Sequence, residues 1–374
     1  MINMKDINIS KIIYQKRKEK NMTQEELATH LNITKAAVSK WETGQSYPDI
    51  TLLPALASLF NISIDNLIGY EPQMHKSDIK KLYHQLANEF TIKPFNEVYE
   101  KCQQIINKYY SCFELLLQMM ILLMNHANLA KDPQLIYEEI NNLALQIVNE
   151  CDDLTIINQT KQIQSLVLLS LNRPLDIIEL FPKIKEPLIV SETTIAQAYI
   201  MLNKYDDANE ILQIYQYQYL LALLQNITNY IYFNVSDTPR VQMASKRLLQ
   251  LIEIYELDKI HPSMILSVYA NLAIVSIGQN EIFQTLTYLK KYVEIAICLE
   301  FPLTLKEDNY FDHLSSWFSQ LDLGILAPRS DAAIIKSVQD VLTNPVFEPI
   351  QNNIEYLQLI NKLDQHLGGF KHEH

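Results

Sequence analysis

Residues 23–44 read TQEELATHLNITKAAVSKWETG, and their apolar and capping positions predict two short helices joined by a tight turn. Leu27, Ala28 and Leu31 recur at the spacing of one face of the first helix. Thr23 precedes that helix and is of a residue type that caps helix N-termini. The turn after Leu31 leads into a second helix, which has one apolar and one polar face.

The second helix, expected over Thr34–Thr43, has an apolar face and a polar face. Val38 and Trp41 are three residues apart, so they lie on the same side and point inward. Gly44 is expected to end the helix, because the residue just past a helix end usually takes a positive φ. The other side carries the residues that could enter a DNA groove, namely Lys35, Ala36, Ser39, Lys40 and Thr43.

The stretch from Asn8 to Tyr70 resembles the lambda-repressor-like (XRE) helix-turn-helix family. The pieces that carry the resemblance are IIYQKRKEKNMTQEELA, LNITKAAVSKWETG and YPDITLLPALASLFNISIDNLI, and the stretch covers about a fifth of the chain. The resemblance implies a five-helix domain in which the helix from Thr34 to Thr43 lies in the major groove. Double-stranded DNA is therefore the expected partner of this domain.

The resemblance also implies individual contacts. Gln24, at the exposed start of the first helix, is expected to meet a phosphate, because helix N-termini attract anions. Many relatives carry Gln where this chain has Lys35 followed by Ala36. Lysine can bind guanine O6/N7 or a phosphate, and the alanine methyl group can contact a thymine methyl group. The resemblance therefore implies a DNA-binding role for this helix but not the base preference of the relatives. The full predicted DNA-binding set is Gln24, Thr34, Lys35, Ala36, Ser39, Lys40, Thr43 and Tyr47.

Three polar residues around this helix have structural alternatives. Arg17 and Glu42 resemble the internal ion pair of the family, so Arg17 is expected to be structural rather than a DNA ligand. Tyr47 lies in the loop before Pro48, where packing beneath the loop is as well supported as contact with the sugar-phosphate backbone.

Charge is unevenly divided along the chain. Residues 1–70 hold eight Lys or Arg and seven Asp or Glu, a balance of +1, so the total of −12 leaves −13 for the remainder. DNA repels an acidic surface, and only the N-terminal domain can supply counterion release. One such domain would bind weakly, which favours a homodimer that places two recognition helices about one helical turn of DNA apart.

The remainder of the chain is predicted to be helical. The six glycines lie at positions 44, 69, 278, 324, 368 and 369, so none occurs from Tyr70 to Ile277. A β-rich fold needs positive-φ turns and would rarely lack glycine over that length. Helices joined by short Asn, Asp and Pro loops do not need it, so the whole protein is expected to be all-α.

Pairs of helices recur in this region. Residues 195–212 and 269–289 each break from one amphipathic helix to another and resemble a tetratricopeptide repeat, with weaker echoes at 168–181 and 233–239. The expected turn markers are separated by 31, 31 and 44 residues, close to the ~34 residues of such repeats. These markers are Asn172, Asn203, Asn234 and Gly278. The predicted domains are a helix-turn-helix domain at 1–70, a linker at 71–78 and a superhelix of helical hairpins at 79–374.

Such a superhelix offers a concave binding surface more often than an active site. Joined to a helix-turn-helix domain, it resembles in architecture the peptide-sensing regulators of Gram-positive bacteria. That resemblance implies an effector, either a short peptide or a small molecule, and a ligand-binding role for asparagine amides. The candidates are Asn226, Asn229 and Asn271, for which a surface position or a helix-end cap is the alternative.

Other chemistries have little support. The four cysteines, at positions 102, 112, 151 and 298, form no C-x-x-C, so neither a metal site nor a disulfide framework is predicted. The H-E-x-x-H of metallopeptidases does not occur in the sequence, and the closing HEH at 372–374 is typical of a frayed tail. Asp308, Asp312 and His313 could mimic a catalytic or metal group, but such a short cluster is typical of a loop. We expect no enzyme activity, no cofactor and no metal.

Membrane association is not expected either. The longest apolar run, residues 115–124, is half of the ~20 residues that span a bilayer, and it predicts a buried helix. Lys5 and Asp6 lead directly into the first expected helix, without the pattern of a signal peptide. These features, with unpaired cysteines, favour a cytoplasmic protein.

Two functions remain open. The first is a ligand-responsive transcription regulator, in which the repeats dimerise and sense the effector. The alternative is a non-catalytic scaffold that uses the helix-turn-helix fold for docking. The polar face with Lys35, Ser39 and Lys40 favours the first, since a docking surface tends to expose apolar residues.

Overall fold

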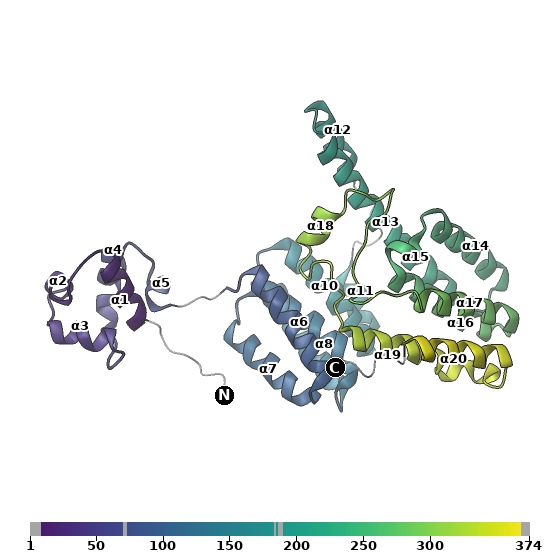
Figure 1. Cartoon of the computed structure of the whole chain (residues 1–374), viewed down its shortest axis with the longest axis horizontal. Helices are drawn as coiled ribbons and strands as arrows, with labels where there is room; N and C mark the ends of the chain where they lie inside the picture. The colour runs from purple at the N-terminus through teal and green to yellow at the C-terminus, as the bar shows by residue number, and fades with distance from the viewer. Residues whose placement is uncertain (1–8, 70–72, 183–184, 186–189, 368–374) are drawn as a thin grey trace. The chain divides into compact units, whose positions relative to one another are not determined.

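The computed structural model describes residues 9–69, 73–182, 185 and 190–367. Throughout these ranges the regular structure is helical, and the one β-bridge joins Thr304 to Leu326. The all-α prediction is confirmed (Figure 1). The chain divides into two compact units. The first comprises Met1–Ile79 and Pro94–Ile177, and the second comprises Lys80–Lys93 and Ile178–His374.

The N-terminal part of the first unit contains five α-helices and a short 3-10 helix. Leu27, Val38, Trp41 and Leu56 are buried in one common core, which explains why these apolar positions are spaced as they are. The expected five-helix domain is confirmed. Its elements are α1 (Ile9–Glu19), α2 (Gln24–His30), α3 (Lys35–Glu42), η1 (Ile50–Leu52), α4 (Leu53–Phe60) and α5 (Ile64–Ile68).

Longer helices follow in the same unit. The apolar run 115–124 lies in α8 and is largely buried, as predicted. Among the described residues, no helix is both long enough and apolar enough to cross a membrane. The helices are α7 (Phe95–Lys108), α8 (Phe113–His126), η2 (Ala127–Leu129), α9 (Pro133–Glu150) and α10 (Leu154–Ser170). Two helices run across the division between the units, α6 (Lys76–Ile92) and α11 (Pro174–Leu180). Helix α6 begins at Lys76, inside the stretch 71–78 that the sequence predicts as a linker.

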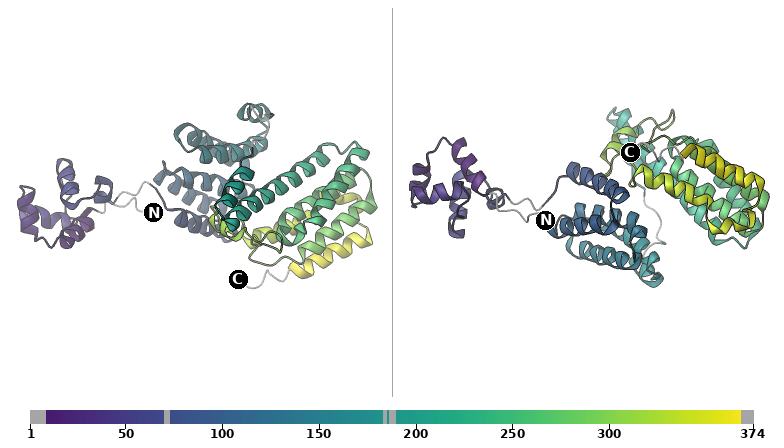
Figure 2. Two further views of the ribbon diagram at one scale, coloured as in Figure 1. Left: turned by 90° about the horizontal axis from the view of Figure 1, so that it is seen from above. Right: turned by 60° about the horizontal axis from the view of Figure 1, so that its bottom comes forward.

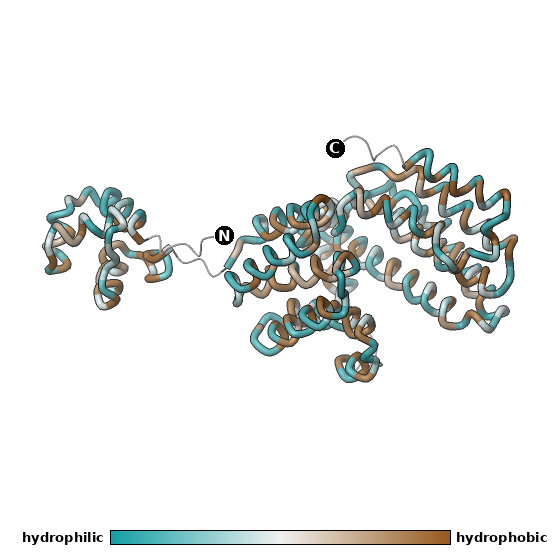
Figure 3. The backbone as a smooth tube through the Cα atoms, turned by 90° about the horizontal axis from the view of Figure 1, so that it is seen from below, coloured by the Kyte–Doolittle hydropathy of each residue, from teal (hydrophilic) through white to brown (hydrophobic). Residues whose placement is uncertain are grey.

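The second unit is built largely from antiparallel helix pairs. The predicted breaks at 195–212 and 269–289 are confirmed, because α12 packs on α13 and α16 on α17 (Figure 2). Hydrophobic and hydrophilic segments alternate along the helices of the chain (Figure 3). Helix α16 is an exception to one-sided burial, since its buried residues lie all round it. The helices are α12 (Glu192–Met201), α13 (Tyr205–Phe233), α14 (Thr238–Ile254), α15 (Leu257–Ile260), α16 (Pro262–Gly278), α17 (Ile282–Ala296), α18 (Ser315–Gln320), α19 (Asp331–Leu342), η3 (Pro345–Ile350) and α20 (Ile354–Leu367).

Asparagine takes the place of glycine at the turns. Asn172 and Asn203 have φ values of 54° and 58°, which confirms them as turn residues. The predicted turn at Gly278 is wrong by two residues, since Gly278 is the last residue of α16 and Asn280 has the positive φ of 60°. Asparagine tolerates this left-handed region better than other non-glycine residues, because its short polar side chain bonds locally.

The regular repeat is interrupted at α13. This helix has 29 residues, which is nearly the length of a whole ~34-residue tetratricopeptide repeat. Asn234 ends it with φ −109°, so the marker is a helix end without a left-handed turn. Helix pairing is therefore confirmed, while a uniform repeat length is not observed.

Candidate functional site

Helix α3 presents its polar face because both of its ends and its inner face are fixed. The Thr34 side chain accepts a hydrogen bond from the Ala37 backbone N–H at 3.3 Å, which caps the start of the helix. Val38 and Trp41 are 0% and 5% exposed, so the inner face is committed to the core. Gly44 adopts φ 73° after the last turn, as expected for the residue that ends a helix.

The outer face holds the residues expected to read bases. Lys35 and Lys40 are exposed, as is Ala36, while Ser39 is half-buried. Lys35 Nζ lies 3.2 Å from Glu25 Oε2 of α2, an ion pair that was not anticipated. Within the described residues, the Lys40 side chain makes no hydrogen bond or ion pair, so its ammonium group remains available. The face therefore combines one paired and one unpaired cation.

Arg17, Glu42 and Gln24 form a polar network beneath this face. Arg17 donates to both Glu42 oxygens at 2.6 and 2.9 Å, and its remaining nitrogen donates to the Met22 carbonyl at 2.7 Å. The predicted internal ion pair is confirmed, with both side chains at most 5% exposed. Burial alone would raise the pKa of Glu42, but the hydrogen bonds from Arg17 and Gln24 outweigh it and lower that pKa. The same bond to Glu42 raises the pKa of Arg17.

Gln24 also hydrogen-bonds to Glu42, a contact that the sequence did not predict. Its Nε2 donates to Glu42 Oε2 at 2.8 Å, so one N–H of this amide is occupied and the other is left for a phosphate. Thr43 is likewise engaged, since its hydroxyl donates to the Ser39 carbonyl at 2.9 Å. Tyr47 is 55% exposed, so it does not pack beneath its loop.

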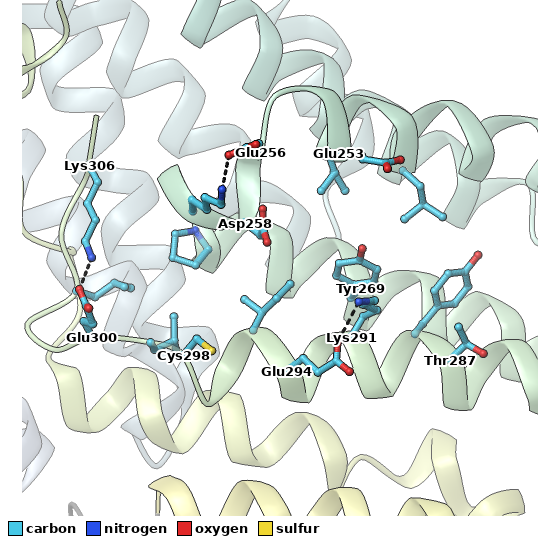
Figure 4. A pocket seen from close by; sticks show the side chains of 18 of the residues that line it. Glu253, Glu256, Asp258, Tyr269, Thr287, Lys291, Glu294, Cys298, Glu300 and Lys306 are labelled. Carbon is cyan, nitrogen blue, oxygen red and sulfur yellow. Dashed lines mark hydrogen bonds and ion pairs between the residues drawn. The ribbon is translucent and has the colours of Figure 1, made fainter. Parts of the chain in front are cut away.

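A second candidate site is a pocket of about 900 Å³ in the second unit (Figure 4). Its walls come from α14, α15, α16, α17 and the segment 298–306. Apolar residues such as Leu249, Ile252 and Leu299 lie beside a rim of charged groups. Tyr269 and Tyr288 also line it, and burial raises the pKa of both phenols. A pocket that joins apolar surface with charged groups is suited to an amphipathic ligand.

The charges of this pocket do not balance. Five carboxylates and three lysines line it, a balance of −2. Each lysine is paired with a glutamate: Lys259 with Glu256, Lys291 with Glu294 and Lys306 with Glu300. Glu253 and Asp258 have no ion-pair partner among the described residues, so the pocket favours a positively charged group.

The three asparagines predicted to bind ligand lie elsewhere. Asn226 and Asn229 are exposed on α13, and Asn229 accepts a hydrogen bond from Gln225 at 3.1 Å. Asn271, on α16, donates to the Ser267 carbonyl at 2.8 Å. None of the three is among the described residues that line this pocket. Their ligand role therefore stays a prediction.

The acidic cluster at 307–314 organises its own loop. Asp308 accepts backbone N–H bonds from Tyr310 and Phe311 at 2.9 and 2.6 Å, as a turn residue does. Asp312 hydrogen-bonds to His313 and raises the pKa of that imidazole. No group of three or more potential metal ligands occurs in the described ranges. The HEH motif at 372–374 lies outside the described residues.

Comparison with known proteins assigns the N-terminal domain. Residues 13–67 match the family model described as Helix-turn-helix (HTH_3). A stretch of 80 residues is 35% identical to the HTH-type transcriptional activator BcrR of Enterococcus faecalis and covers 20% of this chain. The chain spans only 39% of the length of that relative. The N-terminal domain is thus a helix-turn-helix domain of the kind found in DNA-binding transcription regulators.

The similar solved structures are more distant in sequence. PlcR of Bacillus thuringiensis, solved with the peptide PapR7 and DNA, is 15% identical with a TM-score of 0.28, covering 78% of this chain and 95% of PlcR. The apo form of ComR from S. thermophilus is 17% identical with a TM-score of 0.27, covering 79% of this chain and 95% of ComR. Both likenesses are loose in sequence and in superposition.

Proposed function

Because residues 13–67 form a helix-turn-helix domain, we propose that this protein is a transcription regulator that binds a specific DNA operator as a homodimer. Its second unit holds an effector that modulates this binding. The observation that carries the proposal is the exposed polar face of α3, held outward by the buried Val38 and Trp41.

Lys40 and Lys35 have different roles in this proposal. Lys40 is free to meet a phosphate or a guanine edge directly. Lys35 must exchange Glu25 for DNA, and this exchange costs little because exposed ion pairs contribute only about 0–1 kcal/mol. Gln24 offers its second amide N–H to a phosphate, and the methyl group of Ala36 meets a thymine. Thr34 and Thr43 act by holding α3 in place.

Dimerisation is proposed on grounds of charge. The N-terminal domain has a net charge of only +1, because its carboxylates nearly offset its lysines and arginine. One copy is therefore expected to release few counterions from DNA. Two copies on one operator double the number of phosphate contacts and set the half-site spacing.

The effector is proposed to occupy the pocket between α14 and α17. The unpaired carboxylates of Glu253 and Asp258 favour a ligand with a positive charge, such as a peptide amino terminus or a basic side chain. Asn226, Asn229 and Asn271 would then contribute only if the ligand extends beyond the pocket.

The DNA-binding proposal is tested with the double variant Lys35→Ala/Lys40→Ala. We expect operator binding, measured by fluorescence anisotropy on the DNA upstream of the gene, to fall at least tenfold. Lys336→Ala/Lys362→Ala is the matched control, because it removes two exposed lysines from α19 and α20 of the second unit. Equal affinities of the two double variants would refute the proposal. If the unaltered protein binds no DNA, the scaffold alternative is favoured instead.

A further inference from the structure

A second pocket in the second unit differs in chemistry from the one described above. It has a volume of about 450 Å³ and lies between α16 and α19. On α16 its lining positions are 263, 266, 267 and 270, and on α19 they are 334, 337, 338 and 341. Both sets follow the i, i+3, i+4, i+7 pattern, so one whole face of each helix is turned to the pocket.

The walls of this pocket are mostly hydrocarbon. Tyr292 of α17 also lines it, and its hydroxyl is already used, because it donates to the Val338 carbonyl at 2.9 Å. The Ser337 hydroxyl likewise donates to the Ala333 carbonyl at 2.9 Å. The apolar lining residues are Leu266, Ala270, Leu299, Leu303, Ala327, Pro328, Ile334, Val338 and Val341.

Arg329 is the one formally charged residue among the described residues that line this pocket. Its Nε is buried and has no hydrogen-bond partner. Each of the other four arginines of the chain has at least one hydrogen bond: Arg17 to Glu42, Arg173 to Asp176, Arg240 to Asn234 and Arg247 to the Met243 carbonyl. A buried guanidinium nitrogen without a partner is costly, which points to an anion as its missing partner.

The backbone around Arg329 is held on both sides. The Tyr83 hydroxyl donates to the Pro328 carbonyl at 3.0 Å, and the Thr91 and Ser330 hydroxyls are 2.6 Å apart. The facing wall is tied to the same segment, since the Ala327 N–H donates to the Leu303 carbonyl at 3.2 Å. The backbone from which the Arg329 side chain extends is therefore held in place, which lowers part of the entropy cost of binding.

We propose that this pocket binds an aliphatic monocarboxylate, such as a medium-chain fatty acid. The carboxylate pairs with the guanidinium group of Arg329, and the hydrocarbon chain lies between α16 and α19. Guanidinium and carboxylate match in charge and in planar two-point geometry. The apolar faces of the two helices exclude water from the hydrocarbon chain.

A hydrocarbon chain suits these walls better than a peptide does. A bound peptide needs partners for its backbone N–H and C=O groups. Asparagine and glutamine are not among the described lining residues. Two of the three serine hydroxyls already have partners, because Ser337 donates to the Ala333 carbonyl and Ser263 hydrogen-bonds to His261 Nδ1 at 3.3 Å. The pocket shares Leu299 and Leu303 with the one between α14 and α17, but the two differ in charge, since the balance of −2 in the latter opposes an anion.

The test is isothermal titration calorimetry of the full-length protein with hexanoate, octanoate, decanoate and dodecanoate. We expect Kd to fall roughly fourfold for each added methylene until the pocket is filled. Arg329→Gln should weaken decanoate binding roughly tenfold to hundredfold, as the loss of a charged hydrogen bond does. Arg247→Gln is the matched control, because it removes an exposed arginine from α14 and should leave Kd unchanged.

Two further measurements separate this site from a nonspecific apolar surface. Ser267→Phe places a ring in the pocket from an exposed position on α16, so it should block decanoate while the fold, followed by circular dichroism, is retained. 1-Decanol, which lacks the carboxylate, should bind weakly and without dependence on Arg329. Decanoate binding that survives Arg329→Gln or Ser267→Phe overturns the proposal. So does tighter, Arg329-dependent binding of the peptide acid acetyl-Leu-Val-Leu. None of these measurements involves DNA, so they stand apart from the proposed regulatory function.

Discussion

Lys35 and Glu25 form an ion pair across the two helices of the helix-turn-helix, with 3.2 Å between Nζ and Oε2. Both side chains are exposed, at 60% and 71%, so the pair is held in water and is weak. Its position matters more than its strength. A carboxylate beside α3 repels the phosphates that Lys35 is proposed to approach, so we expect Glu25 to limit the affinity for DNA.

Replacing Glu25 by Gln should therefore increase DNA affinity. The variant frees Lys35 and removes one negative charge, and we expect Kd for the operator to fall up to about fivefold at low salt, the equivalent of about 1 kcal/mol. The salt dependence of binding should steepen, because one more cation releases counterions. Glu348→Gln, an exposed carboxylate of η3, is the control. If Glu25→Gln leaves both affinity and salt dependence unchanged, Lys35 does not contact DNA.

The buried pair of Arg17 and Glu42 should dominate the stability of the N-terminal domain. Arg17→Ala leaves the Glu42 carboxylate buried without its main partner, and we expect a loss of about 3 kcal/mol, the low end for breaking a buried ion pair. Hydrogen–deuterium exchange of full-length protein would report the loss in peptides covering α1 to α3. Exposed Lys20→Ala is the control. Unchanged exchange in Arg17→Ala would show that the network adds nothing to stability.

The same pair predicts a dependence on pH. Because the folded-state pKa of Glu42 is lowered, its contribution is complete above its ordinary value of 4.5. That contribution is lost as pH falls through the lowered pKa, since the unfolded chain then binds the proton more readily. Glu42→Gln should remove this part of the acid sensitivity. The measurement compares hydrogen–deuterium exchange of α1 to α3 in neutral and in acidic buffer, for the unaltered protein and for Glu42→Gln. An equal loss of protection on acidification in the two proteins would contradict the prediction.

The spacing of Val38 and Trp41 predicted the inner face of α3, whereas the Arg17–Glu42 pair was predicted only through the resemblance to the helix-turn-helix family. The Lys35–Glu25 pair was missed because it joins two helices whose crossing angle the sequence does not specify. The pocket lined by Glu253 was not predicted either, because the packing of its helices is likewise not specified by local sequence. Its walls come from α14, α15, α16, α17 and the segment 298–306, and only tertiary packing brings these parts of the chain together.

The left-handed asparagines lead to a prediction about stability. Asn203 and Asn280 have φ values of 58° and 60°, a region that costs an alanine roughly 1–2 kcal/mol and glycine nearly nothing. Asn280→Ala should lower the thermal midpoint of full-length protein, whereas Asn280→Gly should match the unaltered protein within about 0.5 kcal/mol. Exposed Asn226→Ala, on α13, is the control. Equal effects of Ala and Gly at position 280 would mean that the side chain of Asn280, and not its backbone, stabilises the turn.

The unpaired carboxylates of the larger pocket give the most direct test of effector binding. Glu253→Gln/Asp258→Asn removes the charge of −2 without changing side-chain size, so a positively charged effector should lose most of its electrostatic attraction. Native mass spectrometry of protein purified from its own host should show a retained small species on the unaltered chain and less of it on the double variant. Glu348→Gln/Glu355→Gln, two exposed glutamates outside the pocket, is the matched control. Retention of the species at the same level by both double variants would place the effector elsewhere, and Asn226, Asn229 and Asn271 would then be the next residues to replace.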